Sequence, residues 1–233
     1  MESLFYISLL FIPVLIAGTT VFFYKLTESQ LKLLLAFSAA YLLALSFLHL
    51  IPEIYSSLTP RNAGIWVLAG FFIQVLLEFF SSGIEHGHAH IHSPKNKIPM
   101  VLLFGLYLHS FIEGLPLSGI FTEASSKELS FLMGITLHNI PISIAFAGLL
   151  IHQHISKNKT IGYLILLALM APLGALVGSF IHTGTEIFTA IVVGIFLHIA
   201  TTIIFESSEK DHRYHITKLL SILCGVALAY FLT

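Results

Sequence analysis

Residues 106–121 read LYLHSFIEGLPLSGIF, an apolar stretch with His109 and Glu113 in its middle. The next apolar stretch, LMGITLHNIPISIAFAGLL (residues 132–150), carries His138 at a similar place. Each fits a helix that crosses a membrane, which needs about 20 mainly apolar residues. Ionisable groups at that depth usually face the interior of a helix bundle and mark an ion or substrate path. The two stretches therefore predict a membrane bundle with a polar centre.

The composition extends this interpretation to the whole chain. Of its 233 residues, 56% are hydrophobic and only 10% are charged, and the mean hydropathy is +0.92. A soluble domain would carry about 25% charged residues. We therefore expect an all-α polytopic membrane protein, with one transmembrane domain over residues 1–233 that lies in the lipid bilayer. A net charge of −1 without a basic stripe argues against a nucleic-acid partner, and one cysteine excludes an intramolecular disulfide framework.

The lengths of the apolar segments place eight helices along the chain. Helices one to three are followed by the pair with the polar centre, helices four and five, and then by helices six to eight. The first segment lacks a basic start and a cleavage site, so we interpret it as a retained helix rather than a signal peptide. The expected ranges are 3–24, 31–54, 62–82, 98–121, 128–152, 160–182, 184–206 and 215–232.

The basic residues predict the orientation of these helices. Nine lysines and arginines lie in or beside the odd-numbered connections, whereas only Arg61 and Lys127 lie in the even-numbered ones. Cytoplasmic connections carry an excess of such residues, so we expect both termini outside. Nine lysines to two arginines, with abundant Phe, Ile and Leu, suit an AT-rich bacterial genome. The expected location is therefore the plasma membrane of a bacterium, its inner membrane.

The third connection, residues 83–97, reads GIEHGHAHIHSPKNK and is expected in the cytoplasm. A short histidine-rich tract beside a membrane is typical of loose, exchangeable metal binding. A solvated linker of incidental composition is the alternative. The histidines of this tract are His86, His88, His90 and His92.

The polar centre itself has the residue types of a metal site. In a helix His109 and Glu113 share a face, and His109 lies roughly 16 Å along its segment, near mid-membrane. His138 reaches a similar depth on the next helix, and imidazole with carboxylate is a ligand set that zinc prefers. Pro116 and Pro141 follow these groups and predict kinks. The alternative is a pair of histidines hydrogen-bonded between helices.

Other polar residues in the apolar segments are candidates for an accessory path. His49 and Glu53 are again four residues apart, near the expected outer end of helix two. They could form part of an access route, or they could be interfacial side chains that reach the headgroups. His198 lies midway along helix seven. It could line the ion path, or it could form a hydrogen bond between helices. Glu78 in helix three is a further exit or packing candidate.

Several of these segments together resemble the ZIP (Zrt/Irt-like) family of divalent metal transporters. HSFIEG (109–114) is similar to the HNxPEG-type motif of its helix four, and HNIPIS (138–143) to the HEIPHE or QNIPEG-like motifs of its helix five. SFLHLIPEI (46–54) and the EFF that ends helix three also look typical. The resemblance implies eight helices in a ZIP-like bundle, outward termini and a His-rich connection between helices three and four.

The same resemblance implies a ligand set, with departures from it. His109, Glu113 and His138 match ligand positions of a first metal site, with help from Asn139 and water. Many family members build a second site beside it. Here the second site is largely lost, since the matching positions hold Ser110, Ile142 and Ala171. We expect one site, with Ser110 as an accessory residue, and the family's frequent dimers imply a homodimer.

The leading hypothesis is a carrier that moves a divalent cation into the cytoplasm. Zn²⁺ is the expected cargo, as substrate rather than resident cofactor, and Fe²⁺, Mn²⁺, Co²⁺ and Cd²⁺ are alternatives. A second hypothesis is a metal-binding sensor or assembly protein that has lost transport with its second site. The third is an intramembrane metal-dependent hydrolase, disfavoured because HEXXH is absent and the obvious carboxylate would already be a ligand. We therefore expect no enzyme.

Overall fold

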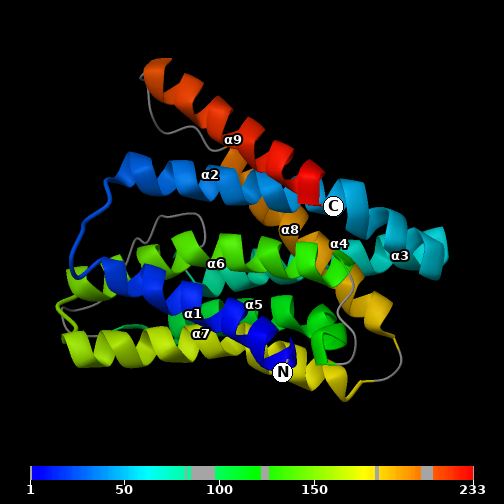
Figure 1. The fold of residues 1–233 in the computed structure, drawn as a ribbon, viewed down its shortest axis with the longest axis horizontal. Helices are drawn as coiled ribbons and strands as arrows, with labels where there is room; N and C mark the ends of the chain where they lie inside the picture. Colours follow the sequence, from blue (N-terminus) through cyan, green and yellow to red (C-terminus); the bar gives the residue numbers. More distant parts are fainter. Residues whose placement is uncertain are drawn as a thin grey trace.

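The computed structural model describes residues 2–81, 83–84, 98–121, 126–181, 184–205 and 212–232, and within them the chain is helical without strands (Figure 1). Nine of the segments are α-helices, and two short ones have π or 3-10 geometry. In chain order they are α1 (Glu2–Thr20), α2 (Glu28–Leu45), the π-helix η1 (Ser46–Leu50), α3 (Ile51–Ser57), α4 (Pro60–Ser81), α5 (Met100–Gly114), the 3-10 helix η3 (Leu115–Phe121), α6 (Ser126–His152), α7 (Lys157–Ser179), α8 (Thr185–Phe205) and α9 (His212–Leu232).

Eight spans in the described residues are long and apolar enough to cross a membrane. One of them is continuous through α2, η1 and α3, from Glu28 to Ser57. The all-α, eight-helix prediction is therefore confirmed. In Figure 1 the two chain ends lie toward the same end of the bundle as α3, as an even number of antiparallel spans requires. Which side of a membrane this end faces stays a prediction.

The fourth predicted helix, 98–121, is divided into α5 and η3. Pro116 has no N–H to donate to the carbonyl of Ile112, and its ring would crowd that carbonyl in an α-helix. The N–H of Leu115 donates to Ile112 instead, and the chain continues with 3-10 geometry. Pro141, in contrast, lies inside an uninterrupted α6. Of the two predicted proline effects, only the first ends an α-helix.

The second predicted helix contains a π-helical stretch that ends two residues before Pro52. Pro52 cannot donate to the carbonyl four residues earlier, and the five residues of η1 are wound more widely than an α-helix. Single π turns within helices are frequent at functional sites. This turn carries His49, and the following α3 carries Glu53.

The helices associate most closely in pairs: α4 with α8, α2 with α9, α1 with α6, and α5 with α7. The last pair meets backbone to backbone. A Cβ atom on Gly174 would overlap the carbonyl oxygen of Phe111, and one on Gly114 would overlap that of Ala171. Small residues allow such close approach of membrane helices. As a result α7 supports α5 along the turn that carries Glu113.

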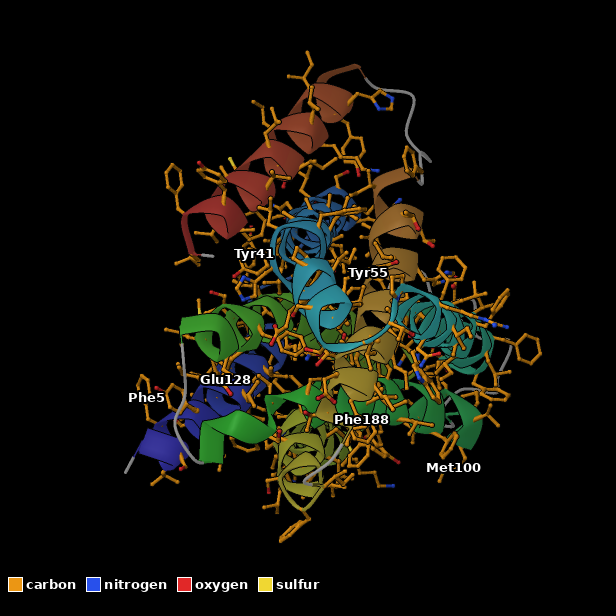
Figure 2. All side chains as sticks on the ribbon, turned by 90° about the vertical axis from the view of Figure 1, so that its right-hand side faces the viewer. Phe5, Tyr41, Tyr55, Met100, Glu128 and Phe188 are labelled. Carbon is orange, nitrogen blue, oxygen red and sulfur yellow. The ribbon has the colours of Figure 1, made fainter. Side chains whose placement is uncertain are left out.

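Side chains sort by position as expected for a bundle surrounded by lipid. Figure 2 shows Phe5 and Met100 at the periphery, and both are exposed. Tyr41 is fully buried between helices, and its hydroxyl donates to the carbonyl of Ser130 at 3.0 Å. Large apolar side chains thus cover the outside, while the polar groups gather inside.

Candidate metal site

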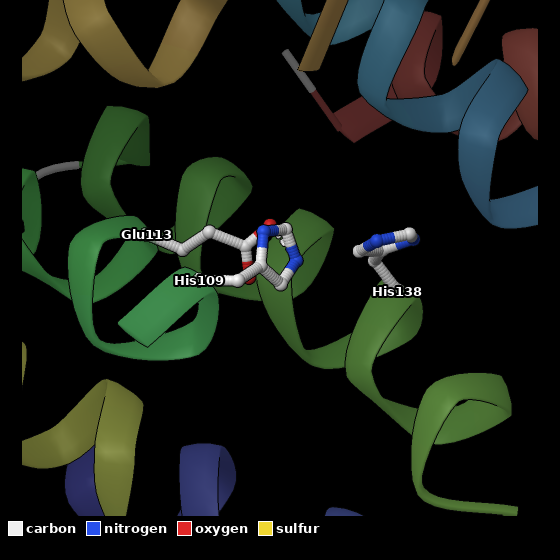
Figure 3. A group of neighbouring side chains, drawn as sticks. All are labelled: His109, Glu113 and His138. Carbon is white, nitrogen blue, oxygen red and sulfur yellow. Dashed lines mark ion pairs between the residues drawn. The ribbon is translucent and has the colours of Figure 1, made fainter. Parts of the chain in front are cut away.

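Three ionisable side chains meet in the centre of the bundle (Figure 3). His109 and Glu113 come from α5 and His138 from α6, and all three have 0% exposure. One potential ligand atom of each lies within 4.8 Å of the others. The Nε2 atom of His109 is 3.3 Å from a carboxylate oxygen of Glu113, and the centroids of the two imidazole rings are 6.1 Å apart. One metal ion could contact all three.

Local helix geometry explains how the sequence brings these groups together. Because α5 stays α-helical through Gly114, His109 and Glu113 project from one face. His138 lies on α6 one turn before Pro141, which has no N–H for the carbonyl of Leu137. The backbone beside the histidine therefore lacks one of its usual helical hydrogen bonds, as membrane helices tolerate near internal polar sites.

Asn139 and Ser110 fix the second oxygen of the carboxylate. The amide of Asn139 donates to Glu113 Oε2 at 3.4 Å, and the Ser110 hydroxyl donates to Asn139 Oδ1 at 3.3 Å. One oxygen of Glu113 therefore faces His109 while the other is held by the amide. Both polar residues are buried. In this geometry Asn139 first of all orients the carboxylate, and Ser110 orients Asn139.

Two further polar residues contact the Nδ1 atoms of the histidines, and neither was predicted from the sequence. Gln74 on α4 places Oε1 3.0 Å from His109 Nδ1, and Ser38 on α2 places Oγ 3.4 Å from His138 Nδ1. Both side chains are completely buried. A single amide inside the apolar run FFIQVLLEFF is a signal that could have identified Gln74, since polar groups at membrane depth usually face functional interiors.

The charge of the site favours a cation. A buried carboxylate is costly unless it is paired or coordinates a metal. A Zn²⁺ ion bound by two neutral imidazoles and one carboxylate would leave a local charge near +1. Three protein ligands also leave a fourth position for water, as in zinc sites that exchange a ligand. The arrangement is therefore suited to binding that can be reversed.

Two of the three positions that suggested loss of a second site hold buried apolar side chains. Ile142 is fully buried in an apolar cluster that includes Phe146. Ala171 is 4% exposed and lies against Gly114. In the part of the chain that the structure describes, His109, Glu113 and His138 are the one group of three metal-ligating side chains at this spacing.

A cavity of about 210 Å³ opens at the end of the bundle that contains α3 and η3. Four ionisable side chains line it, and the Nε2 atom of His49 has no hydrogen-bond partner among the described residues. None of the three central residues lines the cavity, and all three are closed to solvent. The ionisable residues are His49, Glu53, Glu128 (labelled in Figure 2) and Glu186.

His198 is not a member of the central group of three. Its Nε2 atom lies 2.6 Å from a carboxylate oxygen of Glu78, and its ring contacts the edge of Phe71 at a centroid distance of 4.9 Å. This contact is the interhelical hydrogen bond considered for His198, and a place of His198 on an ion path stays a prediction. The predicted metal-binding histidines of the third connection, His86, His88, His90 and His92, lie outside the described residues.

Comparison with known proteins gives a match over the whole chain. A family model described as "ZIP Zinc transporter" matches residues 1–99 and 85–233. The "Zinc transporter ZIP13 homolog" of Drosophila melanogaster is 24% identical, over 87% of this chain and 77% of its own length. "Zinc transporter ZIP13" of Pongo abelii is 28% identical, over 85% and 66%. "Zinc transporter ZIP2" of Homo sapiens is 26% identical, over 63% of this chain and half of its own length.

Proposed function

The chain belongs to the ZIP zinc transporter family, and from this we propose that it carries Zn²⁺ across a membrane by way of His109, Glu113 and His138. The names of its relatives supply the cation, and the resemblance supplies the direction, into the cytoplasm. Because the family consists of transporters, an intramembrane hydrolase is not carried forward. Fe²⁺, Mn²⁺, Co²⁺ and Cd²⁺ are competing cargoes for the same site.

The observation that carries this proposal is the central group itself. Two imidazoles and one carboxylate converge within 4.8 Å at full burial, between helices that are otherwise apolar. Sites of membrane carriers commonly lie at mid-depth between helices of a bundle. Asn139 supports this assignment through its hydrogen bond to Glu113, and its Oδ1 atom is a further potential ligand.

The cavity supports a route to this site from the α3 end of the bundle. His49 and Glu53 line it together with Glu128 and Glu186, and such carboxylates would raise the local concentration of cations. Since the central residues are closed to that cavity, a cation can reach them only after the helices rearrange. The ion then leaves toward the opposite end, where the histidine-rich residues 83–97 would receive it.

The low charge of the site is compatible with release. One carboxylate neutralises only half of the charge of Zn²⁺, so the ion is held less tightly than in a site with several anionic ligands. A carrier needs such a balance, because a cargo that binds too strongly is not delivered. The alternative function, a sensor or assembly protein, would follow if the missing second site were needed for movement through the membrane.

The proposal also covers the orientation, the location and the oligomeric state of the protein. We place both termini outside because the odd-numbered connections carry the basic residues. We place the protein in the plasma membrane of a bacterium on the basis of its composition. Finally, we propose a homodimer from the resemblance to the family. Crosslinking in native membranes and labelling of an added terminal cysteine from outside would test the dimer and the orientation.

The decisive experiment is ⁶⁵Zn²⁺ uptake into proteoliposomes. The wild type should show saturable uptake, and a His109→Ala/Glu113→Ala variant should show none above protein-free vesicles. The matched control is Glu28→Ala/Lys32→Ala, which removes another pair of residues four positions apart, with a contact of 2.7 Å at the start of α2. This control should retain uptake.

Two results would contradict the proposal in different ways. Uptake that survives the double replacement in α5 would place the transport site elsewhere. Zinc binding that depends on His109 and Glu113, without any uptake by the wild type, would favour the sensor. Repeating the uptake assay with Mn²⁺, Fe²⁺, Co²⁺ and Cd²⁺ as competitors would rank the cargoes.

A further inference from the structure

The Nδ1 atom of each central histidine contacts a side chain from another helix. Gln74 on α4 contacts Nδ1 of His109, and Ser38 on α2 contacts Nδ1 of His138. Neither of the two contacting helices carries one of the proposed ligands. A neutral imidazole has one donor and one acceptor nitrogen, so the partner of Nδ1 determines whether Nε2 has a free lone pair.

For His109 the partner atom determines which ring nitrogen carries the proton. The Oε1 atom of Gln74 can only accept, so Nδ1 of His109 carries the proton and Nε2 presents its lone pair toward Glu113. The other amide atom of Gln74, Nε2, is buried and has no hydrogen-bond partner among the described residues. A buried amide that served packing alone would be expected to satisfy both ends. Gln74 instead satisfies the end that faces the histidine.

For His138 the direction follows from counting protons on a hydroxyl. Ser38 Oγ donates its single proton to the carbonyl of Leu35, at 3.0 Å. Toward His138 the same oxygen is therefore an acceptor, and Nδ1 of this ring must be the donor across the 3.4 Å contact. Both rings are thus held in the same tautomer, with both Nε2 lone pairs available to one ion.

We infer that Gln74 and Ser38 are positioning residues that fix the metal-binding tautomer of His109 and His138. The inference rests on the proposed function and adds a requirement to it. The helices that carry the ligands, α5 and α6, associate most closely with α7 and α1, whereas those that carry the positioning residues associate with α8 and α9. Zinc affinity therefore depends on how these two sets of helices are seated against each other.

The experiment is a comparison of zinc affinity in the purified full-length protein. Zn²⁺ is titrated against a chromophoric chelator, and only the binding that disappears in His109→Ala is counted, which removes the contribution of the other histidines. Gln74→Leu should weaken this binding about 10-fold to 100-fold, as is typical for loss of a residue that orients a metal ligand. Gln74→Glu keeps an acceptor oxygen and should restore affinity to within a few-fold of the wild type.

Matched controls separate positioning from general damage. Leu77→Val alters another buried residue of α4, and Ser46→Ala removes a buried hydroxyl that also donates to a carbonyl one turn earlier, at 2.8 Å. Neither should change the affinity more than twofold. Ser38→Ala should weaken binding about tenfold. If Gln74→Leu does not yield monodisperse protein, the comparison of Ser38→Ala with Ser46→Ala decides.

A spectroscopic readout reports the tautomer directly. In metal-free protein labelled with ¹⁵N-histidine, the His109 signals are those lost in His109→Ala. They should show the proton on Nδ1 in the wild type and on Nε2, or exchanging, in Gln74→Leu. Unchanged tautomer and affinity in both Gln74→Leu and Ser38→Ala would overturn the inference while leaving the metal site intact. Zinc binding that survives His109→Ala unchanged would instead overturn the proposed function.

Discussion

The imidazole of His198 on α8 lies 2.6 Å from the carboxylate of Glu78 on α4, and the contact joins two of the most closely associated helices of the bundle. Both side chains are partly exposed, with 12% and 30% of their surface accessible. The pair is separate from the central group that includes His109 and Glu113. The contact joins α4 to α8, so we expect it to stabilise the packing of these two helices.

Replacing His198 should therefore affect stability more than transport. His198→Phe keeps a ring that can contact Phe71 but removes the hydrogen bond to Glu78. We expect a loss of about 1 kcal/mol in stability, the size typical of a partly exposed hydrogen bond or ion pair. Thermal unfolding in detergent measures this loss, and a double-mutant cycle with Glu78→Gln isolates the pair. Zinc uptake that disappears while the unfolding temperature is kept would show instead that His198 lies on the path.

The carboxylates of the cavity beside α3 should increase capture of the ion. A Glu53→Gln/Glu186→Gln variant is expected to raise the apparent KM for zinc about threefold to tenfold at low ionic strength, with little change in maximal rate, because the field that concentrates cations is reduced. The difference should shrink in about 0.5 M salt as screening increases. The single variants Glu53→Gln and Glu28→Gln, the latter at the start of α2, provide a charge-matched comparison. An equal effect at all salt concentrations would contradict a role in attraction.

A second carboxylate in the central group should slow transport while tightening binding. In Asn139→Asp the local charge around Zn²⁺ falls from near +1 to near zero, and the new oxygen lies next to Glu113. We expect at least a tenfold lower Kd, since ligand charge strongly affects metal affinity, together with a lower maximal uptake rate. Equilibrium titration and initial-rate uptake measure the two quantities. Ser110→Ala tests whether orientation of the amide alone matters, and it should weaken binding only slightly.

The close contact between α7 and α5 makes a matched pair of glycine replacements informative. Gly174→Ala places a Cβ atom against the Phe111 carbonyl and should destabilise the protein by about 1–3 kcal/mol. Gly162→Ala, on the same helix, meets nothing within 4 Å and should be neutral or stabilising by up to about 1 kcal/mol. Thermal unfolding compares the two. Equal effects would mean that α7 does not depend on this contact.

The sequence was sufficient for the helices and for the central residues. Apolar length alone identifies a membrane span, and the four-residue spacing of His109 and Glu113 implies one face of a helix. The joint depth of these residues and His138 suggested one group, and the structure brings them together. These features depend on the spacing of residues in one helix or on their depth in the membrane, and both can be derived from residue numbers.

The residues that the sequence analysis missed depend on which helix faces which. A membrane helix that is apolar all round has no contrast between a polar and an apolar face, so its buried side cannot be read from periodicity. Gln74 and Ser38 acquire their partners only when α4 and α2 are placed beside α5 and α6. The two prolines show the same limit. Pro116 ends α5 where the chain turns into η3, whereas Pro141 lies in a helix held by both α1 and α2.

The order in which the chain is made gives the central group a further property. Three of its hydrogen-bond partners, Ser38 on α2, Gln74 on α4 and Asn139 on α6, precede the last three helices. During synthesis these residues leave the ribosome before the last helix, α9, is complete. Zinc could therefore bind to the unfinished bundle, and the cargo could help to assemble its own carrier.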